Sequence, residues 1–411
     1  WPFLGMCYLE FNIMNYVKRI FLSCCILSGT LFAVQAQEQP LVSQSDSVQS
    51  LLERVLPDRN RSLSAQMNLQ FYTSGAAYFT EGSLDEAAFK LNRVRLEILG
   101  SFSEQFSYHF RQSYNKYSNP HSLDNLSSSI EYAFVNWKMS NLFSLMVGKQ
   151  FLSLGGYEYY VNSIKVREFS DFNNNVGAYQ AGVTGTLNFS PTQELVLQVL
   201  NNRSGGDEDT YIYGLPQGVK KTKLPIISTV NWNGLYCDKS LQLRYAAAWG
   251  QLADKKNIYY LTGGHIYERG PILAYLDLMY SREELDSKGL VSDLQGAPVS
   301  TPVTAQNVEY LSVIANFDYR VHPNWNLYVK GAYERAGVYK ANGSFGKGLY
   351  RTTWNAQACV EFFPMRNSEL LIFGHLLYKG HHLTKRARAL GGVDPDTQRV
   401  SIGLVYSIPV F

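Results

Sequence analysis

The sequence is poor in cysteine, and most of its cysteines lie near one end. Only five of the 411 residues are cysteine, and three of these fall within residues 1–36. The remaining two, Cys237 and Cys359, are too few to hold together a disulfide-dense scaffold. Cross-links therefore do not explain how a chain of this length is stabilised, and the pattern of its side chains has to.

Net charge and enzyme motifs are also lacking. Lys and Arg number 37 against 34 Asp and Glu, so there is no basic surplus of the kind that nucleic-acid binding requires. Neither a G-x-S-x-G elbow, an H-E-x-x-H helix, a phosphate-binding loop nor a Cys-x-x-Cys pair occurs. We therefore expect no enzyme activity, no cofactor, no metal site and no nucleic-acid partner.

The first 60 residues differ in character from the rest. A basic pair precedes an apolar run at 20–34, and small residues end at Ala36, which is the order typical of a secretory signal peptide. We expect residues 1–36 to be an upstream extension followed by this signal. Residues 37–60 are too polar for a strand and are predicted to be a short periplasmic segment, either helical or disordered.

Long apolar runs are absent after the signal, but short alternating stretches are abundant. No run of 18 apolar residues follows residue 36, so a membrane-embedded form has to be a closed β-barrel. Apolar and polar side chains alternate with a period of two, and the apolar faces carry no charge, as contact with lipid requires. The clearest examples are 63–71, 241–249, 311–319, 325–333, 354–362 and 400–410.

Sixteen strands are predicted in the domain at 61–411. They lie near 62–73, 89–99, 106–116, 130–138, 142–150, 176–187, 195–201, 223–232, 241–249, 258–267, 272–281, 307–319, 325–335, 349–363, 370–379 and 399–411. Long connections, beginning with 74–88 and including 250–257, alternate with short ones, as in outer-membrane barrels with extracellular loops and periplasmic turns. The predicted fold is all-β: a transmembrane antiparallel β-barrel of about 16 strands in outer-membrane lipid.

A secreted β-sandwich or solenoid is the alternative for this pattern. Many strands here begin and end in aromatic residues, and aromatic girdles at both ends of the strands are typical of membrane barrels. No repeat of constant period occurs, which argues against a solenoid. The barrel is therefore the preferred interpretation.

The polar face of the hairpin at 92–111 carries an unusual set of charges. With Val94 and its alternate neighbours toward lipid, the lumen would be lined by Arg93, Arg95, Glu97, His109 and Arg111. A turn centred near 103 would set Arg95 beside His109 or Arg111. Sixteen strands leave room for an aqueous channel, so these charges would face a passing solute. The alternative is that they only keep the wall hydrated and pair with Glu97.

Four stretches resemble successive blocks of the phosphate-selective porin (O and P type) family: AFKLNRVRLEILGSFSEQFSYHFR, IEYAFVNWK, LFSLMVGKQFLSLGGYE and VGAYQAGVTGTL. The resemblance implies a 16-stranded trimeric porin whose third long loop folds into the lumen and whose basic residues guide anions. That loop corresponds to 151–175. Lys165 and Arg167 would be its contacts with the anion.

These observations predict an outer-membrane porin through which small solutes, with anions such as phosphate favoured, diffuse passively. The expected substrate-binding residues are Arg93, Arg95, Arg111, Lys165 and Arg167. Acidic residues also fall on the predicted lumen face, among them Asp277, Asp318 and Glu334. A general diffusion pore without phosphate preference is therefore the alternative, and a barrel acting as an enzyme or adhesin is a more distant one.

Overall fold

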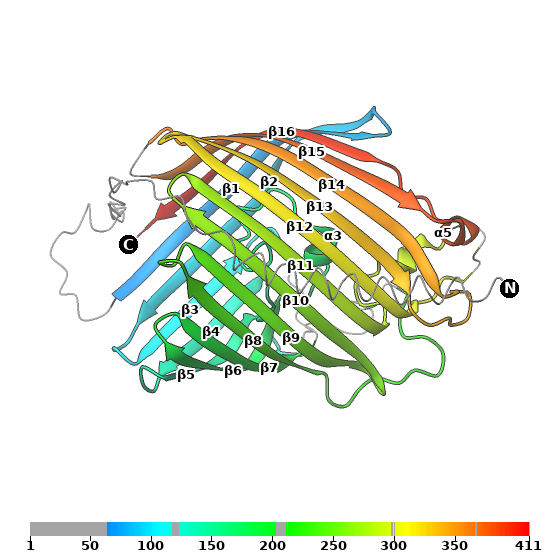
Figure 1. The fold of residues 1–411 in the computed structure, drawn as a ribbon, viewed down its shortest axis with the longest axis horizontal. Coiled ribbons are helices and arrows are strands. Elements are labelled where there is room, and N and C mark those ends of the chain that lie inside the picture. Colours follow the sequence, from blue (N-terminus) through cyan, green and yellow to red (C-terminus); the bar gives the residue numbers. More distant parts are fainter. Residues whose placement is uncertain are drawn as a thin grey trace. The chain divides into compact units, whose positions relative to one another are not determined.

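The structure is a computed structural model, and it describes residues 64–116, 123–202, 211, 213–296, 299, 301–365 and 368–410. The described residues form a closed barrel of 16 antiparallel strands (Figure 1). The predicted signal at 1–36 and the predicted periplasmic segment at 37–60 lie outside the described residues, so that division of the chain stays a prediction.

The strands follow the predicted order and number. They are β1 (Ser64–Thr80), β2 (Ser83–Ser101), β3 (Phe106–Ser113), β4 (Ile130–Lys138), β5 (Phe143–Phe151), β6 (Tyr179–Ser190), β7 (Gln193–Asn201), β8 (Ile226–Tyr236), β9 (Leu241–Ala253), β10 (Lys256–Arg269), β11 (Ile272–Leu285), β12 (Gln306–His322), β13 (Trp325–Val338), β14 (Gly348–Phe362), β15 (Glu369–Leu383) and β16 (Thr397–Pro409). Within the described parts of the chain, three short helices accompany them: α3 (Asp171–Asn174), η1 (Ser292–Leu294) and α5 (Lys385–Ala389).

Each strand pairs with its neighbours in the sequence, and β1 pairs with β16 to close the sheet. Closure leaves no strand edge facing lipid, where an unpaired backbone N–H or C=O would cost several kcal/mol. No helix among the described residues is long and apolar enough to cross a membrane. The predicted all-β barrel is confirmed.

The two faces of the sheet carry the predicted side chains. On β14, Trp354 and Val360 are exposed on the outer surface, whereas Thr353, Asn355 and Gln357 are buried on the inner one. The same alternation places Val400 and Ile402 of β16 outside and Ser401 inside. The outer face is therefore the apolar one, as a lipid-facing surface has to be.

Two connections predicted to be long loops are hairpin turns instead. β1 and β2 continue to a turn at Glu81 and Gly82, so most of 74–88 is strand. Both turn residues have positive φ (50° and 80°), as a two-residue type I′ turn requires. Similarly, most of 250–257 is strand, because β9 and β10 meet at a turn after Ala253. The extension of β1 and β2 was not predicted, because small residues such as Ala76, Ala77 and Ala87 give little alternation between apolar and polar side chains.

The wall is of uneven height. β1 and β2 contain 17 and 19 residues, whereas β3, β4 and β5 contain eight, nine and nine. A transmembrane strand needs about 9–11 residues, so the short strands only just cross the bilayer. Asp124, between β3 and β4, pairs with Lys149 of β5 at 2.9 Å.

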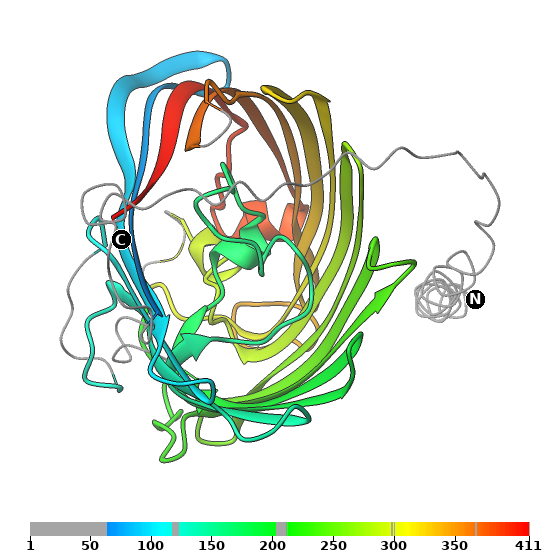
Figure 2. The ribbon, with the colours of Figure 1, turned by 90° about the vertical axis from the view of Figure 1, so that its left-hand side faces the viewer.

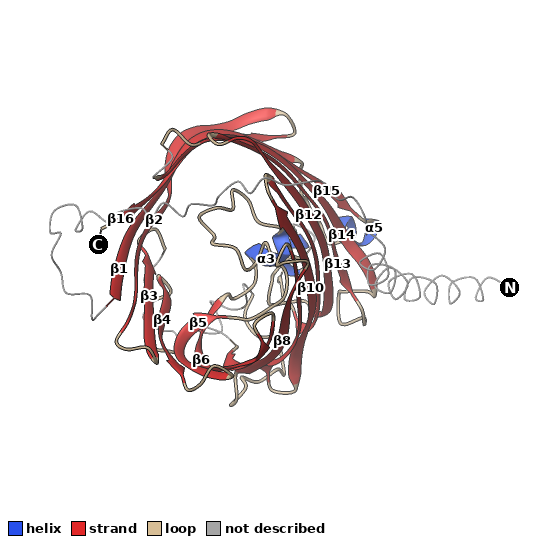
Figure 3. Ribbon diagram, turned by 60° about the vertical axis from the view of Figure 1, so that its left-hand side comes forward, coloured by secondary structure: helices blue, strands red, loops and turns tan. Residues whose placement is uncertain are grey.

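Part of the barrel interior is a packed core. The connection at 152–178, which contains α3, lies within the ring of strands (Figures 2 and 3). Its Leu154 and Phe172 pack in one cluster with Tyr260 and Met279 of the wall and Val291 of the connection at 286–305. Inward-facing side chains of β10–β12 are thus covered by apolar loop residues. The open part of the lumen is correspondingly narrower than 16 strands alone would allow.

The orientation of Val313 yields a first test of the barrel. Val313 lies on β12 between Leu311 and Ala315 on the outer face, so Val313→Arg would put a guanidinium into lipid at a cost of about 2–4 kcal/mol. We expect less folded barrel in a heat-modifiability gel. Ser107→Arg, on the inner face of β3, is the control and should assemble normally. Equal tolerance of both substitutions would contradict the assigned faces.

Candidate functional site

Basic side chains gather on the inner face of β2 and β3 and just beyond the end of β3. We name this set the basic wall; it comprises Arg93, Arg95, Arg111 and Lys116. Two carboxylates, Glu97 and Glu131, lie among them. The basic wall therefore carries four positive charges against two negative charges.

The register of this hairpin differs from the expected one. Arg95 lies opposite Ser113 and Glu97 opposite Arg111, so Arg95 is not beside His109 or Arg111 on the neighbouring strand. The reason is that Ser101 pairs with Ser107, which centres the turn at 104 instead of 103. A one-residue shift of the centre moves the pairing by two residues and keeps every side chain on its predicted face.

Arg95 connects the basic wall to the inward loop. Its guanidinium donates hydrogen bonds to Asn162 Oδ1 at 3.1 Å and Ser163 Oγ at 2.8 Å, and pairs with Glu131 at 3.1 Å. The side chain has no exposed surface. The expectation that Arg95 would be hydrated is therefore wrong, whereas its contact with a solute stays a prediction. Arg95 instead positions the loop at 152–178.

Arg111 is held in a similar way. It pairs with Glu131 at 2.8 Å, donates a hydrogen bond to the Tyr179 hydroxyl at 2.7 Å and lies over the ring of Tyr132 at 4.0 Å. Only 6% of its side chain is exposed. Much of the charge of Arg95 and Arg111 is therefore compensated by Glu131.

Arg93 and Lys116 are the more accessible members of the basic wall. Arg93 is only partly buried and has no ion pair with any described residue, and its Nε and Nη1 atoms are buried without a hydrogen-bond partner. Lys116 pairs with Glu131 at 2.8 Å, but 38% of its side chain is exposed. These two cations are the ones placed to attract an anion in the lumen.

Glu131 was not predicted as part of this site. It lies in β4 between Ile130 and Tyr132, where the pairing with β3 shifts at a bulge. The bulge breaks the simple alternation, so the inward direction of Glu131 could not be assigned from a period of two. Its carboxylate contacts Arg95, Arg111 and Lys116.

The two basic residues predicted on the inward loop differ in their surroundings. Arg167 is buried, pairs with Glu361 of β14 at 3.1 Å and lies over the ring of Phe373 at 4.4 Å. Lys165 is exposed, and its ammonium has no partner among the described residues. Arg167 thus fastens the loop to the wall, whereas Lys165 keeps a free charge.

Two carboxylates of the wall hold the backbone of the inward loop. Asp277 of β11 accepts hydrogen bonds from the N–H groups of Tyr157 and Glu158, each at 2.8 Å. Glu334 of β13 accepts them from Asp171 at 2.8 Å and from Phe172 at 2.9 Å, where α3 begins. A typical intramolecular hydrogen bond contributes about 0.5–1.5 kcal/mol. Together the two carboxylates fix the loop at two points across the lumen.

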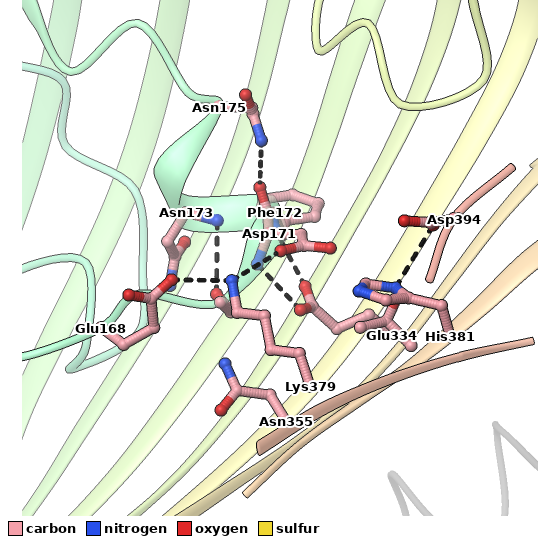
Figure 4. Close-up of polar contacts among 12 residues, drawn as sticks. Glu168, Asp171, Phe172, Asn173, Asn175, Glu334, Asn355, Lys379, His381 and Asp394 are labelled. Atoms are coloured by element: carbon pink, nitrogen blue, oxygen red, sulfur yellow. Dashed lines mark hydrogen bonds and ion pairs between the residues drawn. The ribbon is translucent and has the colours of Figure 1, made fainter. Parts of the chain in front are cut away.

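An ion-pair network fastens the end of the same loop (Figure 4). Lys379 of β15 contacts Glu168 at 2.7 Å and Asp171 at 3.2 Å. Arg351 also pairs with Asp171, and Arg399 pairs with Glu168 at 3.0 Å. Burial alone would raise the pKa of Asp171, but the charges of Lys379 and Arg351 outweigh it and hold that pKa below its ordinary value. Asp171 is therefore ionised at neutral pH.

A 16-stranded membrane barrel with a charged lumen and a loop fixed inside it is the architecture of an outer-membrane channel. The chain belongs to the phosphate-selective porin O and P family, whose model matches residues 65–408. It is thus a channel for passive diffusion, located in the outer membrane, and not an enzyme. No group of His, Cys, Asp and Glu within the described residues could hold a metal ion.

Solved structures with the same fold share little of the sequence. The outer-membrane channel DcaP of Acinetobacter baumannii has a TM-score of 0.59 and 12% identity, over 85% of this chain and 99% of that one. OmpT of Vibrio cholerae has 0.53 and 11%, over 85% and 98%. An anion-selective porin from Comamonas acidovorans has 0.51 and 11%, over 84% and 99%. No curated protein sequence matches the chain significantly.

The two loop-holding carboxylates generate a second test. Glu334→Gln and Asp277→Asn each replace one acceptor oxygen by an N–H donor, which cannot accept from the loop backbone. The loss of one hydrogen bond, about 0.5–1.5 kcal/mol, should loosen the loop. We expect larger and more variable single-channel currents in planar bilayers.

Glu309→Gln is the matched control for this test. Glu309 lies on β12 and accepts a hydrogen bond from the Tyr280 hydroxyl at 3.4 Å, away from the inward loop. Its current should equal that of the unmodified channel. Steady, unmodified currents from both loop-holding variants would show that these carboxylates do not hold the constriction.

Proposed function

We propose that the channel favours small anions, which pass between the basic wall and the inward loop. The observation that carries the proposal is the uneven charge of the basic wall, with four cations against Glu97 and Glu131. Local field decides which ion enters a pore whose overall charge is near zero. Arg93, Lys116 and Lys165 are the accessible cations, while Arg95, Arg111 and Arg167 position them and the loop.

Phosphate is the anion that the family's description names, and the chemistry of the basic wall suits it. A guanidinium can hold two oxygens of a phosphate at once and stays charged at any physiological pH. Arg93 is only partly buried and pairs with no carboxylate among the described residues, so an oxyanion would supply the partner that its guanidinium lacks. Binding has to stay weak for flux to continue.

A general diffusion pore is the second candidate. It is favoured by the balance of charge in the network around Lys379, where Glu168 and Asp171 meet Arg351 and Arg399. If that network rather than the basic wall lies along the solute's path, no anion preference follows. The two candidates differ in the reversal potential in a potassium chloride gradient, which lies toward the chloride value for an anion-favouring channel and near zero for a general pore.

The proposed assembly is a homotrimer. OmpT of Vibrio cholerae, which has the same fold with a TM-score of 0.50, is described in a trimer form. The family resemblance of the sequence implies the same state. Each protomer has a complete lumen, so the selectivity proposed above does not depend on a neighbouring copy.

The selectivity test removes the two accessible cations of the basic wall. Arg93→Ala with Lys116→Ala should shift the reversal potential in a potassium chloride gradient toward that of potassium, and should weaken the block of chloride current by phosphate. Arg95 is left unchanged, since its loss would also release Asn162 and Ser163 of the loop.

Lys220→Ala with Lys223→Ala is the control, because both lysines are exposed in the connection at 202–225. It removes the same net charge elsewhere and should leave the reversal potential unchanged. If the basic-wall variant behaves like this control, the wall is only a hydrated lining and the general-pore candidate is favoured.

A further inference from the structure

We infer that the lumen also binds planar rings, so that the solutes it favours are anions that carry an aromatic ring. The inference rests on the proposed anion preference and narrows its substrate class. It comes from a continuous series of aromatic side chains beside the basic wall, which we name the aromatic track: Phe134, His109, Tyr132, Tyr179 and Phe151.

Each ring of the aromatic track contacts the next one in space. The centroid of His109 lies 4.5 Å from Tyr132 and 5.5 Å from Phe134, and Tyr132 lies 5.3 Å from Tyr179. Tyr179 in turn lies 5.6 Å from Phe151. The rings come from four adjacent strands, β3 to β6. They form one surface along the short side of the barrel.

Edge-to-face geometry keeps these rings from covering each other. Tyr132 meets Tyr179 at 89° and Phe134 at 83°, so neither neighbour stacks on its face. Each of the three is only half-buried, and 22% of the His109 side chain is exposed. Arg111 lies over Tyr132, and the His109 ring is tilted against it at 41°, so a planar solute would contact the part of the ring surface that these neighbours leave exposed.

Side chains of the basic wall contact rings of the aromatic track. Arg111 lies over Tyr132 at 4.0 Å and donates a hydrogen bond to the Tyr179 hydroxyl, and Lys116 lies 5.3 Å from the centre of the Tyr179 ring. A solute whose anionic group meets Lys116 or Arg93 would therefore have its ring beside Tyr132 and Tyr179. Charge and ring surface are arranged to be used by one molecule.

The inward loop supplies an exposed ring of its own. Tyr160 is 55% exposed and lies under the guanidinium of Arg244, which is 3.6 Å from its centre. Loop and wall thus both present ring surface. On β7 and β8 the inner face instead carries polar groups such as Gln198, Thr229 and Asn231.

The test compares two phosphate dianions, one of which carries a phenyl ring, at a pH above the second ionisation of both. Phenyl phosphate and inorganic phosphate are added to single channels in planar bilayers, and the concentration of each that halves the chloride current is measured. We expect phenyl phosphate to act at about a fivefold to tenfold lower concentration, the effect of one additional aromatic contact.

Tyr132→Leu and Tyr160→Leu remove one ring from the wall and one from the loop. Each should bring the ratio of the two blocking concentrations toward one. Because Tyr160 is exposed on a loop, Tyr160→Leu tests the inference even if Tyr132→Leu fails to assemble. Tyr236→Leu removes a ring that is 40% exposed on the outer face of β8 and should keep the unmodified ratio.

Three outcomes would decide against the inference or its basis. Equal block by both compounds in a channel whose reversal potential favours chloride overturns the ring site and leaves anion passage standing. If the ratio of the two blocking concentrations is unchanged in both Tyr132→Leu and Tyr160→Leu, the rings only stabilise the barrel and do not bind the solute. A reversal potential that favours potassium in the unmodified channel overturns the proposed anion preference itself.

Discussion

The pairing of β1 with β16 is the interaction on which the rest of the structure depends. It runs from Asn68 opposite Pro409 to Thr80 opposite Thr397 and turns an open sheet into a barrel. Without it, two strand edges would leave backbone groups unpaired in lipid, where water cannot satisfy them. Closure also encloses a lumen. Every second residue of each strand then faces this one space, so side chains from different strands can contact the same solute.

Within that lumen, the way charges are paired matters more than how many there are. Buried cations such as Arg95 and Arg167 are each matched by a carboxylate, and they hold the inward loop in place. A buried pair produces little field at a distance, whereas an accessible and incompletely matched cation produces much more. The same residue type therefore serves two purposes, and burial determines which.

The number and order of the strands, and the face on which each side chain lies, could be predicted. They depend on the alternation of apolar and polar residues, which is visible in the sequence. Val313 and Trp354 were assigned to lipid in this way. Register could not be predicted as well, since a turn centred at 104 instead of 103 changes the partner of Arg95 without changing its face. The extended hairpin at 74–88 was missed because alanines and glycine show no alternation.

The contacts that fix the candidate site depended on long-range geometry. Lys165 and Arg167 look equivalent in the sequence, yet Arg167 is buried against Glu361 and Lys165 is exposed. Asp277 and Glu334 were assigned to the lumen, but their role as acceptors for the loop backbone follows only from the folded path of 152–178. Glu131 was missed because a bulge interrupts the alternation around it.

The inward loop also bears on the order in which the barrel assembles. Arg95 precedes this loop, but many other partners follow it by long distances along the chain, such as 120 residues for Tyr157 and Asp277 and 232 for Arg167 and Arg399. Contacts between such distant segments form slowly, because a long loop has to close first. An intermediate that lacks β13–β16 would have a loop without most of its ionic partners and a sheet with open edges. Insertion of the last strand therefore completes the wall and the constriction in the same step.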